Sequence, residues 1–177
     1  MNILPNMNAI SPWKRFDEVQ EQVLRGNGAF LVAVDRRGRP NAMTIGWIQV
    51  GTVWSRPVGL VLVRPSRYTH DCIAHRGAFT VSVPLGTMAE ELAFCGSRSG
   101  RDCDKFAELG LHTEPGTKVQ APLLADCAVA YECRVVARAE LKLEGLLDEE
   151  VRAKYYPRGD FHTLFFGEIV AAWELSA

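Results

Sequence analysis

A series of short apolar runs, each of strand length, is the strongest constraint on how this chain can fold. Residues 78–83 show the pattern most clearly, because Phe79, Val81 and Val83 alternate with small or hydroxyl-bearing residues, as side chains do on the two faces of a strand. The predicted strands are 29–34, 41–50, 58–63, 78–83, 129–136 and 164–173. The polar stretch at 35–39 contains Gly38 and predicts a hairpin turn between the first two strands.

Short helix-like segments separate these runs. The longest predicted helix spans residues 12–25, with Ser11 as its cap, Pro12 in its first turn and apolar residues at a spacing of three to four. Shorter helices are expected at 67–75, 88–94, 102–109 and 149–155, and the Gly- and Pro-containing stretch 111–122 is expected to be a long surface loop. Strands and helices do not alternate regularly, so the sequence predicts a mainly β fold with peripheral helices, a β-barrel rather than a Rossmann fold. We expect one domain over residues 1–177, with the barrel at about 28–175.

Composition excludes several classes of protein. Hydrophobic residues make up 47% of the 177 residues, which is enough for a core, and the net charge of −1 argues against a broadly basic nucleic-acid binder. No apolar run approaches the roughly 20 residues that span a bilayer, and the N-terminus does not resemble a secretory signal. We therefore expect a cytoplasmic protein with neither a membrane nor a nucleic acid as its partner.

The cysteine pattern does not indicate a metal site. The five cysteines are an odd number and contain no C-x-x-C pair, so reduced thiols and no bound metal are expected. The four histidines are scattered and the G-x-S-x-G motif of hydrolases is absent. His162, at the start of the last predicted strand, is the one histidine kept as a weak candidate.

The first of three polar segments that interrupt the apolar pattern is 39–47. Asn41 and Thr44 can donate and accept hydrogen bonds, and the small residues Ala42 and Gly46 allow a flat ligand to approach the backbone closely. A hairpin strand with one solvated face would have the same composition.

The second polar segment, 63–71, places a strand end before a helix start. Free amides and the positive end of the helix dipole favour an anion there, and Arg64 and Arg67 add charged donors. Ser66 is expected to cap the helix. A solvated loop with an Arg67–Asp71 helix pair is the alternative.

The third polar segment, 95–106, contains two glycines and two serines before a helix predicted to start near Asp102. Ser97, Ser99 and Gly100 would lie beside Arg101 and Lys105, which are four residues apart and so share one side of a helix. This combination suits a phosphate group, although a plain capped helix would also fit. One strand that a flat ligand can approach and two helix starts that favour an anion together suit a phosphorylated aromatic cofactor such as FMN.

Several blocks resemble the flavin reductase-like family with the FMN-binding split β-barrel, in particular its flavoredoxin-like branch. They are N-A-M-T-I-G-W at 41–47, V-R-P-S-R-Y-T at 63–69, F-T-V-S-V at 79–83, C-G-S-R-S-G-R-D-C-D-K-F at 95–106 and H-T-L-F-F-G-E-I-V at 162–170. Their order and spacing, from Phe16 to the C-terminus, carry the resemblance. It implies a Greek-key-like split barrel and a homodimer with FMN near the subunit interface.

The resemblance also implies roles for individual residues. Asn41, Met43 and Thr44 would line the isoalloxazine ring, residues 64 and 66–69 would contact the ribityl chain and phosphate, and Ser99, Arg101 and Lys105 would complete the phosphate pocket. Gly46 departs from the family, in which many members carry serine. The predicted cofactor-binding residues are Asn41, Ala42, Met43, Thr44, Gly46, Trp47, Arg64, Ser66, Arg67, Tyr68, Thr69, Ser97, Ser99, Gly100, Arg101 and Lys105.

The expected activity is NADH- or NADPH-dependent reduction of flavin, with electrons passed to a second acceptor. The flavin carries that chemistry, so no acid–base residue is required. An FMN-binding electron carrier, reduced by a partner protein and without a nicotinamide site, is the main alternative. A barrel that binds another ligand such as haem, or that has lost its cofactor, is the third.

Overall fold

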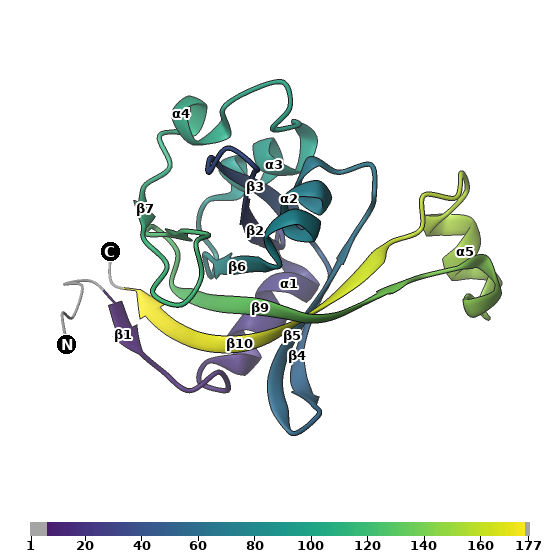
Figure 1. Cartoon of the computed structure of the whole chain (residues 1–177), viewed down its shortest axis with the longest axis horizontal. Coiled ribbons are helices and arrows are strands. Elements are labelled where there is room, and N and C mark those ends of the chain that lie inside the picture. Colours follow the sequence, from purple (N-terminus) through teal and green to yellow (C-terminus); the bar gives the residue numbers. More distant parts are fainter. Residues whose placement is uncertain (1–6, 176–177) are drawn as a thin grey trace.

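An antiparallel sheet of eight strands forms the body of the protein in a computed structural model that describes residues 7–175 (Figure 1). The strand order is β3-β2-β6-β9-β10-β5-β4, and β1 pairs with β10. The prediction of a mainly β fold with peripheral helices is confirmed. The sheet strands are β1 (Met7–Ala9), β2 (Ala29–Val34), β3 (Pro40–Ile45), β4 (Ile48–Val53), β5 (Arg56–Val63), β6 (Ala78–Val83), β9 (Val129–Glu140) and β10 (Thr163–Leu175).

Helices and a small second sheet lie around this body. The helices are α1 (Phe16–Arg25), α2 (Tyr68–Arg76), α3 (Ala89–Ser97), α4 (Lys105–Leu109), the 3-10 turn η1 (Leu143–Gly145) and α5 (Glu149–Tyr155). The short strands β7 (Thr113–Glu114) and β8 (Leu123–Leu124) pair with each other at the two ends of the predicted surface loop. No helix within residues 7–175 is long and apolar enough to cross a membrane.

The predicted strand at 41–50 is wrong, because the chain bends at Gly46 and Trp47 and divides it into β3 and β4. β3 pairs with β2 and β4 pairs with β5, so the two strands are the opposite ends of the sheet order. No pairing between β3 and β4 occurs among the described strands. The bend crosses this open seam of the barrel, and both of its residues are exposed.

The hairpin of β9 and β10 crosses the whole molecule and continues beyond the barrel. Register shifts between Phe166 and Gly167, and between Ile169 and Ala171, bend the pair as β-bulges do. Gly167 is required at the first shift, because a Cβ there would lie 2.8 Å from Cβ of Cys133. Past the barrel, the ends of the two strands carry η1 and α5 on a projecting arm, residues 136–162 (Figure 1).

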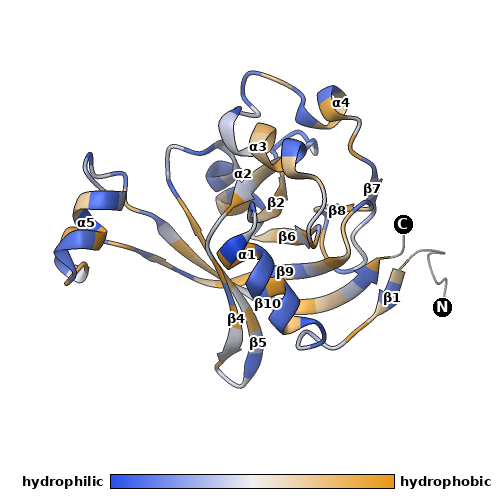
Figure 2. Ribbon diagram, turned by 180° about the vertical axis from the view of Figure 1, so that it is seen from behind, coloured by the Kyte–Doolittle hydropathy of each residue, from blue (hydrophilic) through white to orange (hydrophobic). Residues whose placement is uncertain are grey.

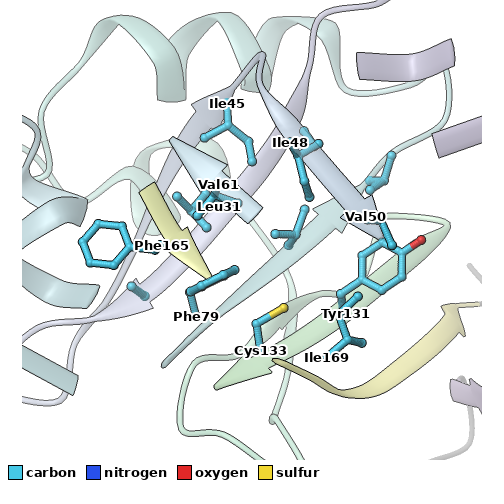
Figure 3. Packing of buried hydrophobic residues seen from close by; sticks show 14 of the residues in the cluster. Leu31, Ile45, Ile48, Val50, Val61, Phe79, Tyr131, Cys133, Phe165 and Ile169 are labelled. Carbon is cyan, nitrogen blue, oxygen red and sulfur yellow. The ribbon is translucent and has the colours of Figure 1, made fainter. Parts of the chain in front are cut away.

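The barrel interior is filled from all the central strands. Leu31, Val61, Phe79 and Phe165 pack there with neighbouring apolar side chains (Figure 3). Strand β2 alternates between this core and a second cluster, because Phe30 and Val32 point instead toward buried residues of α3 and β8. Burial on both faces explains why β2 reads as a continuous apolar run.

Four predicted helix starts differ from the structure, and for α3 the shift is one residue, from 88 to Ala89. α1 begins at Phe16, because Ser11 closes a separate turn by accepting from the amide of Trp13 (Figure 2 shows α1 from its outer side). α4 begins at Lys105, because the Asp104 side chain accepts from the amides of Phe106 and Ala107 and so caps the helix there. Arg67 takes the N-cap position of α2 without a side-chain hydrogen bond, in place of Ser66.

Candidate functional site

A cavity of about 220 Å³, the seam pocket, opens at the bend between β3 and β4. It lies where the last residues of β3, the end of β5 and the base of the arm meet. Six of the predicted residues and the weak candidate His162 meet there. The lining residues are Met43, Thr44, Gly46, Trp47, Leu62, Arg64, Arg67, Tyr155 and His162.

Aromatic rings form one wall of the seam pocket. The ring centroids of Trp47 and His162 are 4.9 Å apart, and those of Trp47 and Tyr155 are 5.0 Å apart with near-perpendicular planes. Contacts of this geometry hold aromatic side chains in fixed orientations. The wall therefore offers rigid apolar surface beside the backbone of Gly46.

His162 is a neutral imidazole within this wall. Its ring is buried, and Nδ1 lies 2.7 Å from the Tyr156 hydroxyl. Burial, helped by the nearby positive charge of Arg64, lowers the pKa of His162 from 6.5 to about 4. The side chain can therefore contribute a hydrogen bond or a packing surface at neutral pH but no charge.

Arg64 fastens the arm to the barrel. Its guanidinium donates to the carbonyl oxygens of Tyr155, at 2.7 Å, and Asp160, at 2.8 Å, and lies over the Tyr156 ring. The Ser66 hydroxyl donates to the Asp160 carboxylate at 2.6 Å. Two predicted ligand-binding side chains thus hold the turn that positions Tyr155 and His162.

A second cavity of about 70 Å³, the loop pocket, adjoins the first. Met43 and Arg67 line both cavities, so the two adjoin between the seam and the start of α2. Predicted residues from all three polar segments meet here. The lining residues are Asn41, Met43, Ser66, Arg67, Tyr68, Thr69, Cys95, Gly96, Arg98, Ser99, Gly100 and Lys105.

The start of α2 presents its amides to the loop pocket. Asn41 donates to the Thr69 hydroxyl at 2.7 Å, a buried contact that fixes the helix start against β3. Within residues 7–175 no side chain caps α2, and the guanidinium groups of Arg67 and Arg98 make no hydrogen bond. Helix-end amides and two arginines without hydrogen-bonded partners there are a favourable surrounding for an anion.

Lys105 is almost fully buried, with 3% of its surface exposed, at the edge of the loop pocket. Nζ donates to the carbonyl oxygens of Ala42, at 2.7 Å, and Cys95, at 2.9 Å. Burial lowers the pKa of this ammonium group. Two of its three hydrogens are thus engaged in joining β3 to α3, which leaves one for a ligand.

Three predicted residues do not line either pocket. Arg101 pairs with Asp71 at 2.6 Å and lies over the Tyr68 ring, and it is not on one helix side with Lys105 because α4 starts only at Lys105. The Ser97 hydroxyl donates back to the carbonyl of Phe94 within α3. Ala42 lies beneath the site, fully buried, and contributes the carbonyl that Lys105 binds.

Sequence reasoning missed five lining residues: Leu62, Cys95, Gly96, Arg98 and Tyr155. Arg98 lies inside the segment judged to suit a phosphate, so its charge was a usable signal. Tyr155 reaches the pocket only because the arm folds back at its base, and nothing local in the sequence indicates this. No cluster of three or more metal-ligating side chains occurs in the described part of the chain.

Comparisons with known proteins agree with this geometry. The flavoredoxin of Desulfovibrio vulgaris (Miyazaki F) superposes with a TM-score of 0.66 at 29% identity, over 84% of this chain and 68% of that one. The flavoredoxin of Methanosarcina acetivorans gives 0.66 at 28% identity, over 83% and 68%. An FMN-binding protein from Thermus thermophilus gives 0.63 at 25% identity, over 82% and 68%.

Sequence comparison supports the same relationship. A protein of Archaeoglobus fulgidus is 33% identical over 132 residues, which are 75% of this chain and 64% of the relative. This chain spans between about half and two thirds of the length of the curated relatives it matches. The family model for the flavin reductase like domain matches residues 25–177. The chain belongs to the flavin reductase-like family, whose fold is the FMN-binding split barrel.

Proposed function

We propose that this protein binds FMN and accepts a hydride from NADH or NADPH, passing the electrons to a second acceptor. The observation that carries the proposal is that the seam pocket and the loop pocket adjoin and share the lining residues Met43 and Arg67. A partly aromatic cavity that adjoins a cavity lined by arginines and the start of a helix suits a ring joined by a short chain to a phosphate.

The residues present fit FMN at both ends. The seam pocket combines the backbone at Gly46 with the rigid wall of Trp47 and Tyr155. The loop pocket combines the amides of α2 with Arg67, Arg98 and one remaining hydrogen of Lys105. When bound, FMN supplies hydride and electron transfer at its isoalloxazine ring.

The protein's own part in the reaction is to bind and orient. The wall of Trp47 fixes the position of a ring, while Arg64 holds the turn that carries Tyr155 and His162. His162 remains uncharged at neutral pH, so it adds no positive charge beside the ring. Arg67, which lines both cavities, lies where it can contact the chain between ring and phosphate.

A second copy of the chain would complete the site. Both cavities are smaller than the roughly 300–1,000 Å³ of pockets that enclose a ligand, so one copy leaves the flavin partly uncovered. The arm beside the seam pocket exposes the apolar side chains of Leu143, Leu147 and Val151, and Figure 2 colours parts of the ribbon on and beside α5 as hydrophobic. We infer a homodimer in which the arm of one protomer lies on its partner.

The direct test is a visible absorption spectrum of the purified protein with added FMN after gel filtration, followed by anaerobic NADH or NADPH. A retained flavin band that NADH or NADPH bleaches supports the reductase. Bleaching by dithionite alone would overturn nicotinamide dependence and favour an electron carrier. A protein that retains no flavin would overturn the cofactor and the proposed activity together.

Arg98→Ala tests which cavity holds the phosphate. Arg98 lines only the loop pocket, so the variant should weaken FMN binding by about tenfold or more, the value of one charged hydrogen bond. Riboflavin, which lacks the phosphate, should bind wild type and variant alike. Fluorescence titration with both ligands measures this, and an equal loss for both would show that the phosphate lies elsewhere.

A further inference from the structure

A third and larger cavity, the arginine groove, runs along the opposite side of the α2 start. It measures about 830 Å³. Its floor is one face of α2, with Tyr68, Asp71, Cys72 and His75 at helical spacing. Its sides are the β2–β3 turn at 35–39 and the segment formed by Gly100 and Arg101.

The turn that carries most of the positive charge is rigid. The carboxylate of Asp35 accepts from the amides of Arg37, at 2.8 Å, and Arg39, at 2.9 Å. The Arg76 guanidinium donates to the carbonyl oxygens of Asp35 and Arg36 from the other side. The backbone of the turn is therefore fixed by groups other than the side chains of Arg36 and Arg37.

Four arginines face two aspartates in the groove, in a chain whose net charge is −1. Arg39 pairs with Asp35, and Arg101 pairs with Asp71. Among residues 7–175 the side chains of Arg36 and Arg37 make no ion pair or hydrogen bond, and both are exposed. The groove thus keeps two positive charges that no side chain neutralises.

The groove adjoins the loop pocket. Tyr68 and Gly100 line both cavities, so these two residues form the wall between them. A ligand whose first phosphate lies at the start of α2 can place a second phosphate over this wall and follow the helix face beyond it. The exposed ring of His75 and the planar guanidinium groups offer stacking surfaces for a base along that path.

We propose that the arginine groove binds the phosphorylated adenosine half of a dinucleotide, with Arg36 and Arg37 as its phosphate ligands. Two dinucleotides carry this chemistry to the site. FAD would extend from the loop pocket, and NADPH would place its 2′-phosphate on the arginines. The inference rests on the proposed flavin site and adds selection between FMN and FAD, or between NADH and NADPH.

The test compares wild type with the double variant Arg36→Ala, Arg37→Ala. Apoprotein is titrated with FMN and FAD, and FMN-loaded protein is assayed anaerobically with NADH and NADPH. The variant should weaken FAD binding or raise the NADPH concentration needed for half-maximal rate by about tenfold, and leave FMN and NADH unchanged. A selective loss of FAD affinity would identify FAD as the ligand of the groove, and a selective rise in the NADPH requirement would identify NADPH.

Arg25→Ala is the matched control, because Arg25 is an exposed arginine at the end of α1, just before the N-terminal end of β2, and its one ion pair among residues 7–175 is with Glu21. Calorimetry with 2′,5′-ADP provides a readout that needs no flavin. Binding by wild type and loss in the double variant support the groove even if FMN does not bind. Unchanged affinities for all ligands, or an equal loss for FMN and FAD and for NADH and NADPH, would overturn the proposal.

Discussion

Backbone groups hold several of the charged side chains around the two pockets and the arginine groove. Arg64 donates to two carbonyl oxygens, Lys105 donates to two more, and the Asp35 carboxylate accepts from two amides. Backbone partners of this kind are fixed by the strands and turns that carry them, so each charge is held in one position. For Asp35, burial alone would raise the pKa, but these amide bonds and the Arg39 side chain lower it to about 2.

Protonation of His162 should make the free energy of unfolding fall as the pH is lowered. Its folded-state pKa of about 4 lies below the usual value of 6.5, so the unfolded chain binds the proton first as the pH falls. The stabilising contribution of the neutral His162 ring is complete above pH 6.5 and is lost as the pH falls to about 4. The free energy of unfolding should drop by about 3 kcal/mol from this group.

Urea unfolding of wild type and His162→Gln between pH 7 and pH 4 measures this effect. The difference between the two proteins should shrink by that amount on acidification, since the variant lacks the titrating ring. Parallel curves for wild type and His162→Gln would contradict the assigned pKa.

At the scale of elements, one buried carboxylate organises the loop between β7 and β8. Glu132 on β9 is fully buried and accepts from the amides of residues 117–119, from the Thr117 hydroxyl and from the Trp173 indole. Burial would raise the pKa of Glu132, but these donors outweigh it and lower the pKa. The loop is thus anchored by an acceptor that lies outside it in sequence.

Glu132→Gln should destabilise the protein by about 3 kcal/mol, because an amide group would face N–H donors that a carboxylate satisfies. The loss should appear in urea unfolding, together with faster hydrogen exchange at the amides of residues 117–119. Glu140→Gln, at the exposed end of the same strand, is the control and should cost little. Equal stabilities for the two variants would contradict the anchoring role.

The elements also show what the sequence can and cannot predict. Alternation and apolar runs predicted the positions of β2, β5 and β6, and the predicted range of α5 matches the structure. The division at Gly46 could not be predicted, because it depends on β3 and β4 pairing at opposite ends of the sheet. The C-terminal end of β9 was missed because its last residues, such as Arg138 and Glu140, are polar and lie on the arm.

The candidate site, like the elements, was predictable from the sequence only in part. The three polar segments were predicted from local composition, and their meeting at two adjoining pockets agrees with that prediction. Ligand binding by the individual residues and the single-domain organisation stay predictions. Arg101 was assigned to the phosphate from helix spacing as well as from the family resemblance, and Asp104 as the cap of α4 removes the argument from spacing.

At the scale of the whole molecule, the arm exposes apolar side chains beyond the barrel. Leu147, with 92% of its surface exposed, lies between η1 and α5, beyond the end of the barrel. Burying such a side chain is worth roughly 1.5–3 kcal/mol, so a second copy has a clear gain from covering it. The seam pocket lies at the base of the same arm through Tyr155 and His162, so dimerisation and flavin binding should be coupled.

Leu147→Glu should therefore convert a dimer into a monomer and weaken FMN binding in the same step. Light scattering after size exclusion reports the mass, and FMN titration at matched protein concentrations reports the coupling. Leu24→Glu introduces the same charge at another leucine, 78% exposed on α1, and should leave both properties unchanged. A monomeric wild type would refute the dimer. A Leu147→Glu monomer that retained full affinity for FMN would show instead that one chain holds the flavin alone, and that the arm serves assembly only.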